Sequence, residues 1–186
     1  MFEKILISIQ RVGRFSEKEQ ALFVSKLKNL TIQKNDCLLK TGQVCSAVYF
    51  IETGAIRQSH ITENGDELTL NLLTDNDWVL DFDSFMQQKP AKNTLTALEK
   101  TDLFELNIQG IHALIAESQA FLMLGKFFQH GVKDSIYDTL PLPEDKYKHL
   151  LQRKPQLLQA FPLKYIAAYL KMTPETLSRV RRKINQ

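Results

Sequence analysis

Two short helical segments separated by only three residues constrain the C-terminal end of this chain more than any other feature. In LKYIAAYL, residues 163–170, apolar side chains recur one turn apart, and Ala167 is small enough for a close helix crossing. KMT forms the break, with Thr173 as a cap and Pro174 at the first position of the next segment, PETLSRVRRKI. This pattern predicts a helix-turn-helix. Its inward side chains should be Ile166, Ala167, Leu170, Met172, Leu177, Val180 and Ile184.

The second of these helices should present a polar, basic face. Glu175 and Arg179 lie four residues apart, and their side chains suit cytosine N4 and guanine. A surface ion pair worth about 0.3–0.5 kcal/mol is the simpler alternative. The capping residues, the spacing of the core residues and the basic flank together favour DNA binding over a simple surface ion pair. The predicted base-reading residues are Thr173, Glu175, Thr176, Ser178 and Arg179. The predicted phosphate contacts are Lys164, Lys171, Arg181, Arg182 and Lys183.

Charge is distributed unevenly along the chain. Residues 1–140 hold 14 Lys/Arg and 18 Asp/Glu, whereas residues 141–186 hold 10 and 3. A basic end of this kind indicates a nucleic-acid or anionic-surface partner. A solvated basic tail is the alternative, but the apolar periodicity of this stretch favours a folded domain. Pro141 and Pro143 mark the boundary, so we predict domains at 1–140 and 141–186.

Short apolar stretches bounded by Gly, Asn and Asp begin at about residue 31 and predict strands. Thr53-Gly54 lies between two of them, and Asn64-Gly65 is a strong hairpin signal. Regular short strands with turns between them predict a small antiparallel barrel or roll. Residues 1–30 precede it and are predicted to be helical, with a capping box formed by Ser16 and Glu19.

A longer helix is predicted from about residue 119 to residue 138, after the strands. Its apolar seam is longer than one sheet face needs, which favours pairing with a second copy of the same helix. Packing of the whole seam on its own roll is the alternative. The predicted dimer-helix residues are Phe121, Leu124, Phe128, Val132 and Ile136.

Several functional classes lack support in this sequence. Cys37 and Cys45 are most simply reduced thiols, and the scattered histidines have no metal-ligand spacing, so no metal site is predicted. No nucleophile–base pair or phosphate-binding glycine loop is found, and the acids Asp75, Asp77, Asp81 and Asp83 have no histidine nearby, so no enzyme is predicted. No apolar run approaches the ~20 residues of a membrane span, and the N-terminus lacks signal-peptide features, which predicts a cytoplasmic protein without a membrane partner.

The order of these elements resembles the Crp–Fnr transcription regulators of bacteria over essentially all 186 residues. The motifs are GQVCSAVYFIETGAIR, ENGDELTL, DNDWVLDFDSF and IAAYLKMTPETLSRVRRKI. The resemblance implies an α+β fold. Its parts are an antiparallel β-roll like a cyclic-nucleotide-binding domain (a double-stranded β-helix) flanked by helices, a long dimerisation helix, and an all-α, winged-helix-like helix-turn-helix domain. The wing is expected to be absent or truncated.

The same resemblance implies the function and partners. It predicts a homodimeric, sequence-specific regulator that binds double-stranded DNA at an inverted repeat and has RNA polymerase as a further partner. In the family, the residues matching Glu175 and Arg179 read base edges. A sensor or adaptor module that binds a small effector or a protein without reading DNA is the alternative. The family often has Gly with positive φ at the turn position held here by Lys171, a replacement that costs ~1 kcal/mol.

The predicted effector site departs from the cyclic-AMP-binding members. Leu80 and Asp81 replace a Gly-Glu pair, and Ala91 or Lys92 stands where those members have the phosphate-binding arginine. A lysine supplies only a point charge in place of the arginine fork. We therefore predict no cyclic AMP binding of the usual kind and no cofactor, with the effector unknown. The predicted pocket residues are Leu80, Asp81, Phe82 and Lys92.

Overall fold

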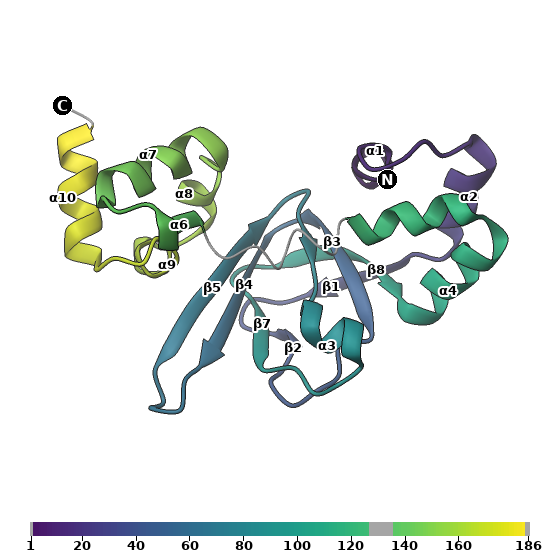
Figure 1. Cartoon of the computed structure of the whole chain (residues 1–186), viewed down its shortest axis with the longest axis horizontal. Coiled ribbons are helices and arrows are strands. Elements are labelled where there is room, and N and C mark those ends of the chain that lie inside the picture. The colour runs from purple at the N-terminus through teal and green to yellow at the C-terminus, as the bar shows by residue number, and fades with distance from the viewer. Residues whose placement is uncertain (1, 127–135, 185–186) are drawn as a thin grey trace.

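Two four-stranded antiparallel sheets form a β-roll in the computed structural model of the chain, which describes residues 2–126 and 136–184 (Figure 1). One sheet has the order β1-β8-β3-β6 and the other β2-β7-β4-β5. The predicted antiparallel roll is therefore confirmed. The strands are β1 (Lys28–Ile32), β2 (Cys37–Leu39), β3 (Ala47–Thr53), β4 (Ala55–Ile61), β5 (Glu67–Thr74), β6 (Trp78–Val79), β7 (Asn93–Ala97) and β8 (Thr101–Asn107).

Two turns connect β3, β4 and β5 in different ways. Gly54 carries the chain from the first sheet into the second, with φ of 121°, and a Cβ there would overlap Thr101. The strands predicted on either side of Gly54 therefore exist, but they lie in different sheets. β4 and β5 form the predicted hairpin, and its five-residue loop is closed by the Thr62 N–H donating to the Asp66 carbonyl at 2.9 Å. Of the Asn64-Gly65 pair, Gly65 alone is left-handed, with φ of 86°.

Helices α1 (Glu3–Gln10), α2 (Glu17–Ser25) and α4 (Ile108–Glu117) lie together at one end of the roll (Figure 1). The predicted capping box is present: the Glu19 N–H donates to Ser16 Oγ at 3.3 Å and the Ser16 N–H donates to Glu19 Oε2 at 2.8 Å. The prediction that helix extends to residue 30 is wrong. Strand β1 begins at residue 28, because pairing along β8, with Leu30 opposite Leu103, satisfies its backbone.

The segment predicted as a dimer helix begins differently. Residues Gln119–Leu124 form a 3-10 helix, η1, in which Phe121 is 1% exposed and Leu124 is 2% exposed. The Phe121 ring stacks on Phe15 at 5.3 Å, so both residues belong to the core of the roll and not to a surface that a second copy could cover. Phe128 and Val132 lie outside the described residues, as does the side chain of Ile136.

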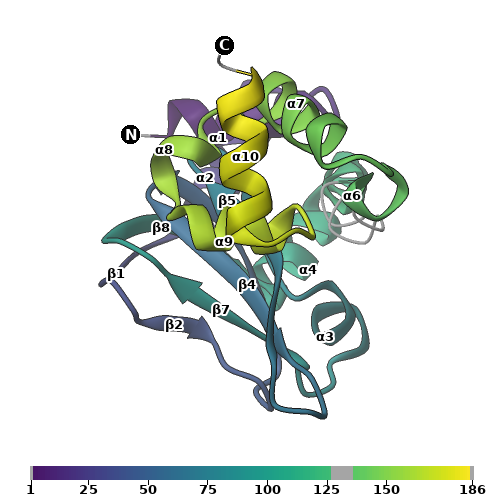
Figure 2. The ribbon, with the colours of Figure 1, turned by 90° about the vertical axis from the view of Figure 1, so that its left-hand side faces the viewer.

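A helical unit, residues 136–184, follows and has its own core. Its helices are α6 (Ile136–Thr139), α7 (Pro143–Arg153), α8 (Leu157–Ala160), α9 (Leu163–Tyr169) and α10 (Pro174–Ile184). Leu150, Leu157 and Ile166 are fully buried at its centre. Ala55 and Leu72 reach this core from the outer face of the second sheet, so the unit packs against β4 and β5 of the roll (Figures 1 and 2). The remaining helix, α3 (Phe82–Gln87), lies on the roll.

Candidate nucleic-acid interface and effector pocket

The turn between α9 and α10 is built by local interactions. Lys171 adopts a left-handed conformation with φ of 56°, as expected for the position where the Crp–Fnr regulators often have glycine. The N–H of Met172 donates to the Ala167 carbonyl at 3.0 Å and closes the end of α9. Thr173 caps α10, because the Thr176 N–H donates to its Oγ1 at 3.2 Å. Both predictions for this turn are confirmed.

Burial along α10 separates an inner stripe from an outer one. Leu177 and Val180 are buried and pack with Ala167, which is fully buried at the crossing with α9. The opposite stripe is exposed, and α10 lies at the surface of the helical unit, away from the roll (Figure 1). We call this exposed stripe the reading face; its residues are Glu175, Ser178, Arg179 and Arg182.

Two residues of the reading face carry opposite charges without pairing directly. Among the described residues, no ion pair joins Glu175 to Arg179, and the Arg179 guanidinium instead donates to Thr176 Oγ1 at 3.3 Å. The pKa of Glu175 is lowered by its backbone N–H at the helix N-terminus, by Thr173 and by Arg179. Glu175 is therefore ionised at neutral pH, as an acceptor for a base amino group must be. The alternative, a simple surface ion pair between Glu175 and Arg179, is therefore not present in the part of the chain that the structure describes.

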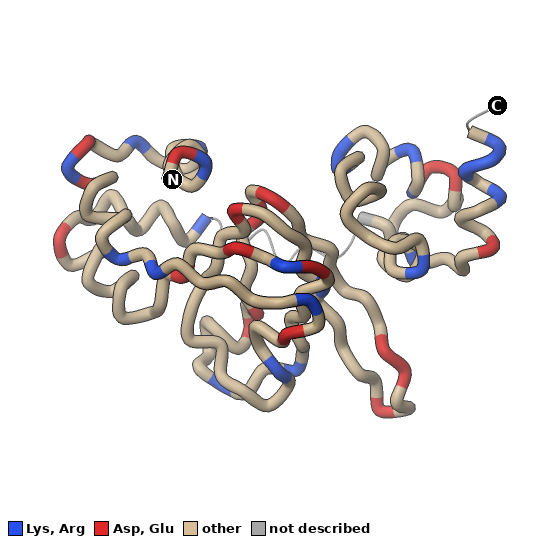
Figure 3. Tube along the Cα trace, turned by 180° about the vertical axis from the view of Figure 1, so that it is seen from behind, with Lys and Arg blue, Asp and Glu red and all other residues tan. Residues whose placement is uncertain are grey.

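The predicted phosphate contacts lie in different environments. Arg182 and Lys171 are exposed at the two ends of α10 and its turn. Lys183 Nζ is 2.7 Å from Glu144 Oε1 of α7, which also lowers the pKa of Glu144. Arg181 is half-buried, and its Nε is buried with no hydrogen-bond partner in the described part of the chain. In Figure 3 the trace of this helix is blue at several positions near the C-terminus, where Lys and Arg residues occur.

The fifth predicted contact, Lys164, faces the roll. Its Nζ lies 4.8 Å from the centre of the Tyr165 ring. The same ring receives the guanidinium of Arg57 at 4.4 Å, and Arg57 also pairs with Glu67 at 2.5 Å. Arg57 is 7% exposed, so this contact joins β4 to α9 at the boundary between the roll and the helical unit. Sequence analysis did not identify this role of Arg57.

The four predicted effector residues do not form one site. Asp81 is 2% exposed and its carboxylate accepts hydrogen bonds from the Ser84 N–H at 3.0 Å and from Asn93 Nδ2 at 2.7 Å. It therefore caps α3. Lys92 is exposed and lines no described cavity, whereas Leu80 and Phe82 do line one.

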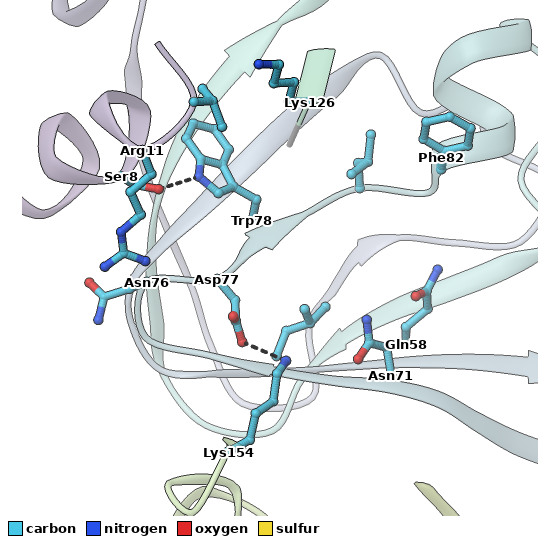
Figure 4. Close-up of a pocket in the computed structure, with 13 residues that line it drawn as sticks. Ser8, Arg11, Gln58, Asn71, Asn76, Asp77, Trp78, Phe82, Lys126 and Lys154 are labelled. Carbon is cyan, nitrogen blue, oxygen red and sulfur yellow. Dashed lines mark hydrogen bonds and ion pairs between the residues drawn. The ribbon is translucent and has the colours of Figure 1, made fainter. Parts of the chain in front are cut away.

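That cavity, which we call the junction pocket, has a volume of about 560 Å³ (Figure 4). Its walls come from α1, β4, β5 and β6, and from Lys154 at the end of α7, so the roll and the helical unit both contribute. Lys154 Nζ lies 3.7 Å from Asp77 Oδ2. Trp78 Nε1 donates to Ser8 Oγ at 2.8 Å and holds α1 against the roll.

Two further observations concern the described ranges 2–126 and 136–184. None of their helices combines the length and hydrophobicity of a membrane span. Their histidine, cysteine and acidic side chains form no group of three or more that could hold a metal ion.

The comparison with known proteins agrees with this geometry. Residues 29–118 match the family described as the cyclic nucleotide-binding domain. The catabolite activator protein of Thermus thermophilus is 20% identical, with 92% of this chain and 84% of that chain covered and a TM-score of 0.58. FixK2 of Bradyrhizobium japonicum is 15% identical, with 86% and 84% covered and a TM-score of 0.67. The chain has the Crp–Fnr fold.

Other matches have the same character. The c-di-GMP responsive global regulator CLP of Xanthomonas campestris is 14% identical, with 91% of this chain and 92% of that chain covered and a TM-score of 0.61. No curated protein matches the sequence. The predicted resemblance is thus confirmed at the level of the fold, and the roll contains the match to a cyclic nucleotide-binding domain.

The segment from β6 through α3 to β7 contains the positions at which the sequence predicted departures from the cyclic-AMP-binding members. Ala91 is 3% exposed and Lys92 is exposed, so the two candidates for the position of the phosphate-binding arginine lie in different environments. Asp81 is committed to Ser84 and Asn93. An alanine methyl group and a carboxylate supply no positive charge to a cyclic phosphate.

Proposed function

We propose that this chain is a homodimeric, sequence-specific DNA-binding transcription regulator that acts in the cytoplasm. The observation that carries the proposal is the reading face of α10. It is an exposed polar and basic stripe on a helix whose opposite side is buried and whose N-terminus is capped by Thr173. A helix presented in this way fits the major groove, where its N-terminal half reaches base edges. The Crp–Fnr fold supports the same function by analogy.

Each residue of the reader has a proposed role. Arg179 donates to guanine and Glu175 accepts from cytosine N4, while Thr173, Thr176 and Ser178 lie beside them and adjust the fit. Lys171 and Arg182 are exposed and suit phosphate contacts. Lys183 would first have to leave Glu144, and Lys164 and Arg181 would have to reorient from their present positions, before they reached a phosphate.

The proposed assembly is a dimer on an inverted repeat. Two α10 helices would enter successive major grooves whose half-sites lie roughly 34–36 Å apart. Residues within 119–138 that are not already in the core of the roll would supply the dimer contact, and RNA polymerase would be a further partner. The regulator would not respond to cyclic AMP through the usual phosphate site, because Asp81 is engaged by Asn93 and neither Ala91 nor Lys92 supplies the guanidinium fork of an arginine.

Selection from a random duplex pool, at low and at physiological salt, tests the proposal. The purified chain should recover an inverted repeat, and Arg179→Ala should weaken binding to that site by ~1–3 kcal/mol and relax one base position. Arg14→Ala, an exposed arginine in the N-terminal region, is the matched control and should change neither quantity.

Two results would count against the proposal. An unchanged base preference for Arg179→Ala would remove that residue from the reader. Recovery of no sequence, together with partner binding that is insensitive to salt, would favour an adaptor that binds protein, because phosphate contacts always make DNA binding depend on salt.

A further inference from the structure

The junction pocket combines parts of the molecule that lie far apart in the sequence. Ser8 and Arg11 reach it from α1, Trp78 from β6, and Lys154 from the end of α7 (Figure 4). Its volume of about 560 Å³ lies in the range of pockets that enclose small organic molecules, 300–1,000 Å³.

An amide pair lies on the inner face of the roll at this pocket. Gln58 of β4 and Asn71 of β5 are directly opposite in the strand register, and both side chains are half-buried. Asn71 Oδ1 accepts from the Leu72 N–H at 3.0 Å, but within the described residues its amide nitrogen and the whole Gln58 amide make no hydrogen bond. Amides in an apolar roll are costly unless a partner satisfies them. Facing the cavity, they offer donors and acceptors to a ligand.

The charges around the pocket favour an anion. Arg11, Lys126 and Lys154 line it, against one carboxylate, Asp77. Asp77 is already engaged: it accepts from the Thr74 N–H at 3.0 Å and pairs with Lys154. Burial also raises the pKa of Asp77, although Lys154 opposes this effect.

The rest of the wall is apolar and partly aromatic. Leu73, Trp78, Leu80 and Phe82 form it together with the amide pair. Such a surface suits a flat hydrocarbon body, since aromatic side chains bury large apolar areas against flat partners. The pocket thus offers an apolar wall, an amide pair and a cationic rim.

We propose that the junction pocket binds a small organic acid with a flat apolar body. The acidic group would lie at the Lys154 and Arg11 rim, the body against Trp78 and Leu80, and a polar substituent would meet Gln58 and Asn71. A ligand of this class needs no ribose contact at Asp81, whose carboxylate already accepts from Asn93. Because Lys154 belongs to the helical unit, the bound acid would compete with Asp77 for it and change how that unit is held. This last consequence rests on the proposed DNA-binding function; the binding itself does not.

Fluorescence titration of the full chain, without DNA, tests the binding. The probe is 8-anilinonaphthalene-1-sulfonate, an aromatic acid, and its uncharged pair is N-phenyl-1-naphthylamine. We expect one acidic probe per chain, a dissociation constant at least ~5-fold lower than for the uncharged probe, and a change in the emission of Trp78, the only tryptophan. Lys154→Gln should weaken the acidic probe ~5–10-fold, as expected for losing a charge-assisted contact, and leave the uncharged probe unchanged.

Two more variants locate the site. Gln58→Phe should fill the cavity and weaken both probes, whereas Lys92→Gln, which removes the same charge as Lys154→Gln outside the pocket, should weaken neither. Equal effects of Lys92→Gln and Lys154→Gln would overturn the proposal, as would equal affinities for the two probes. Displacement of the acidic probe by cyclic AMP at micromolar concentration would overturn the ligand class. Each of these results could be obtained while the chain still selects an inverted repeat from the duplex pool. Failure of the ligand proposal is therefore distinguishable from failure of the DNA-binding proposal.

Discussion

The reading face of α10 and the amide-lined wall of the junction pocket both present polar side chains that a partner could bind, yet they are built in opposite ways. The reading face is convex, and its residues lie within one helix of 11 residues. The pocket is concave, and its walls come from residues between Ser8 and Lys154. A binding surface on one helix depends on the core beneath it, whereas a pocket of this kind depends on how separate elements meet.

The two surfaces are also supported by different cores. The roll packs around residues such as Phe50 and Ile51, and the helical unit packs around a second cluster that includes Leu150. A substitution that destabilises one core should therefore disrupt the surface above that core before it disrupts the other. The predictions below test how far the two surfaces are independent.

The largest effect is expected in the core of the helical unit. Leu150 is fully buried, so Leu150→Ala should lower the free energy of unfolding by about 2–5 kcal/mol through the lost contacts and the cavity left behind. Denaturation should be followed both by helical circular dichroism and by emission of Trp78, which lies in the roll. Helical signal should be lost before the Trp78 signal changes.

Leu122→Ala removes the same atoms from a side chain that is 59% exposed, and should change stability by less than about 0.5 kcal/mol. If the two signals of Leu150→Ala stayed coincident, the helical unit and the roll would unfold as one body, and the contrast between their surfaces would lose its structural basis.

The same contrast explains how much could be predicted from the sequence. The cap at Thr173 and the proline at the start of α10 are local and were predicted from neighbouring residues, whereas the left-handed Lys171 was expected from the resemblance to the Crp–Fnr regulators. Short apolar stretches and the Asn64-Gly65 signal likewise indicated β4 and β5. They could not show that Gln58 and Asn71 border a cavity, because that depends on where α1 and α7 pack.

Errors in prediction also occurred where distant segments meet. Residues 28–32 pair with β8, 69 to 77 positions later, and this pairing replaced the predicted helix. Phe121 has the spacing of a helix-dimer seam, but Phe15 and the roll cover it. Lys183 was predicted to be a phosphate contact, although Glu144, 39 residues earlier, pairs with it in the free chain.

Arg57 provides the next largest effect, because it joins the two regions. Its guanidinium pairs with Glu67 and lies 4.4 Å from the Tyr165 ring centre of the helical unit. Arg57→Ala removes both contacts and should lower the free energy of unfolding by about 1–3 kcal/mol. Calorimetry should show the transitions of the roll and the helical unit moving apart. Arg14→Ala, which removes an exposed arginine, should leave the calorimetric profile unchanged. If Arg57→Ala also left the profile unchanged, Arg57 would not join the two regions.

A smaller, pH-dependent effect is expected at Asp77, in the wall of the pocket. Burial raises its pKa in the folded chain, so its ionisation opposes folding once the pH rises above the ordinary aspartate value of about 4. Asp77→Asn keeps an oxygen for the Thr74 N–H and removes that charge. The variant should melt at the same temperature as the wild type below pH 4 and at a higher temperature at pH 7.

The gain should stay within about 1 kcal/mol, because Lys154 loses its partner at the same time. Asp83→Asn, the same charge change on an exposed side chain, corrects for net charge. If Asp77→Asn lowered the melting temperature at pH 7, the ion pair with Lys154 would stabilise the fold by more than burial of the carboxylate costs. The Asp77–Lys154 pair would then hold together the two sides of the pocket rim.

The smallest effect concerns the edge of the reading face. Glu144 pairs with Lys183 at 2.7 Å and so competes with a DNA phosphate for the same ammonium group. Glu144→Gln should raise affinity for non-specific duplex about twofold to fivefold and steepen its salt dependence by less than the ~0.9 expected for one added phosphate contact. Asp145→Asn makes the same charge change one residue along α7, where no ion pair to Lys183 is found in the described residues, and separates the contact from the general loss of negative charge. Equal gains for the two variants would show that the net charge of the helical unit, and not release of Lys183, sets the affinity. A gain confined to Glu144→Gln would mean that even this convex, local surface is adjusted by a residue from another helix.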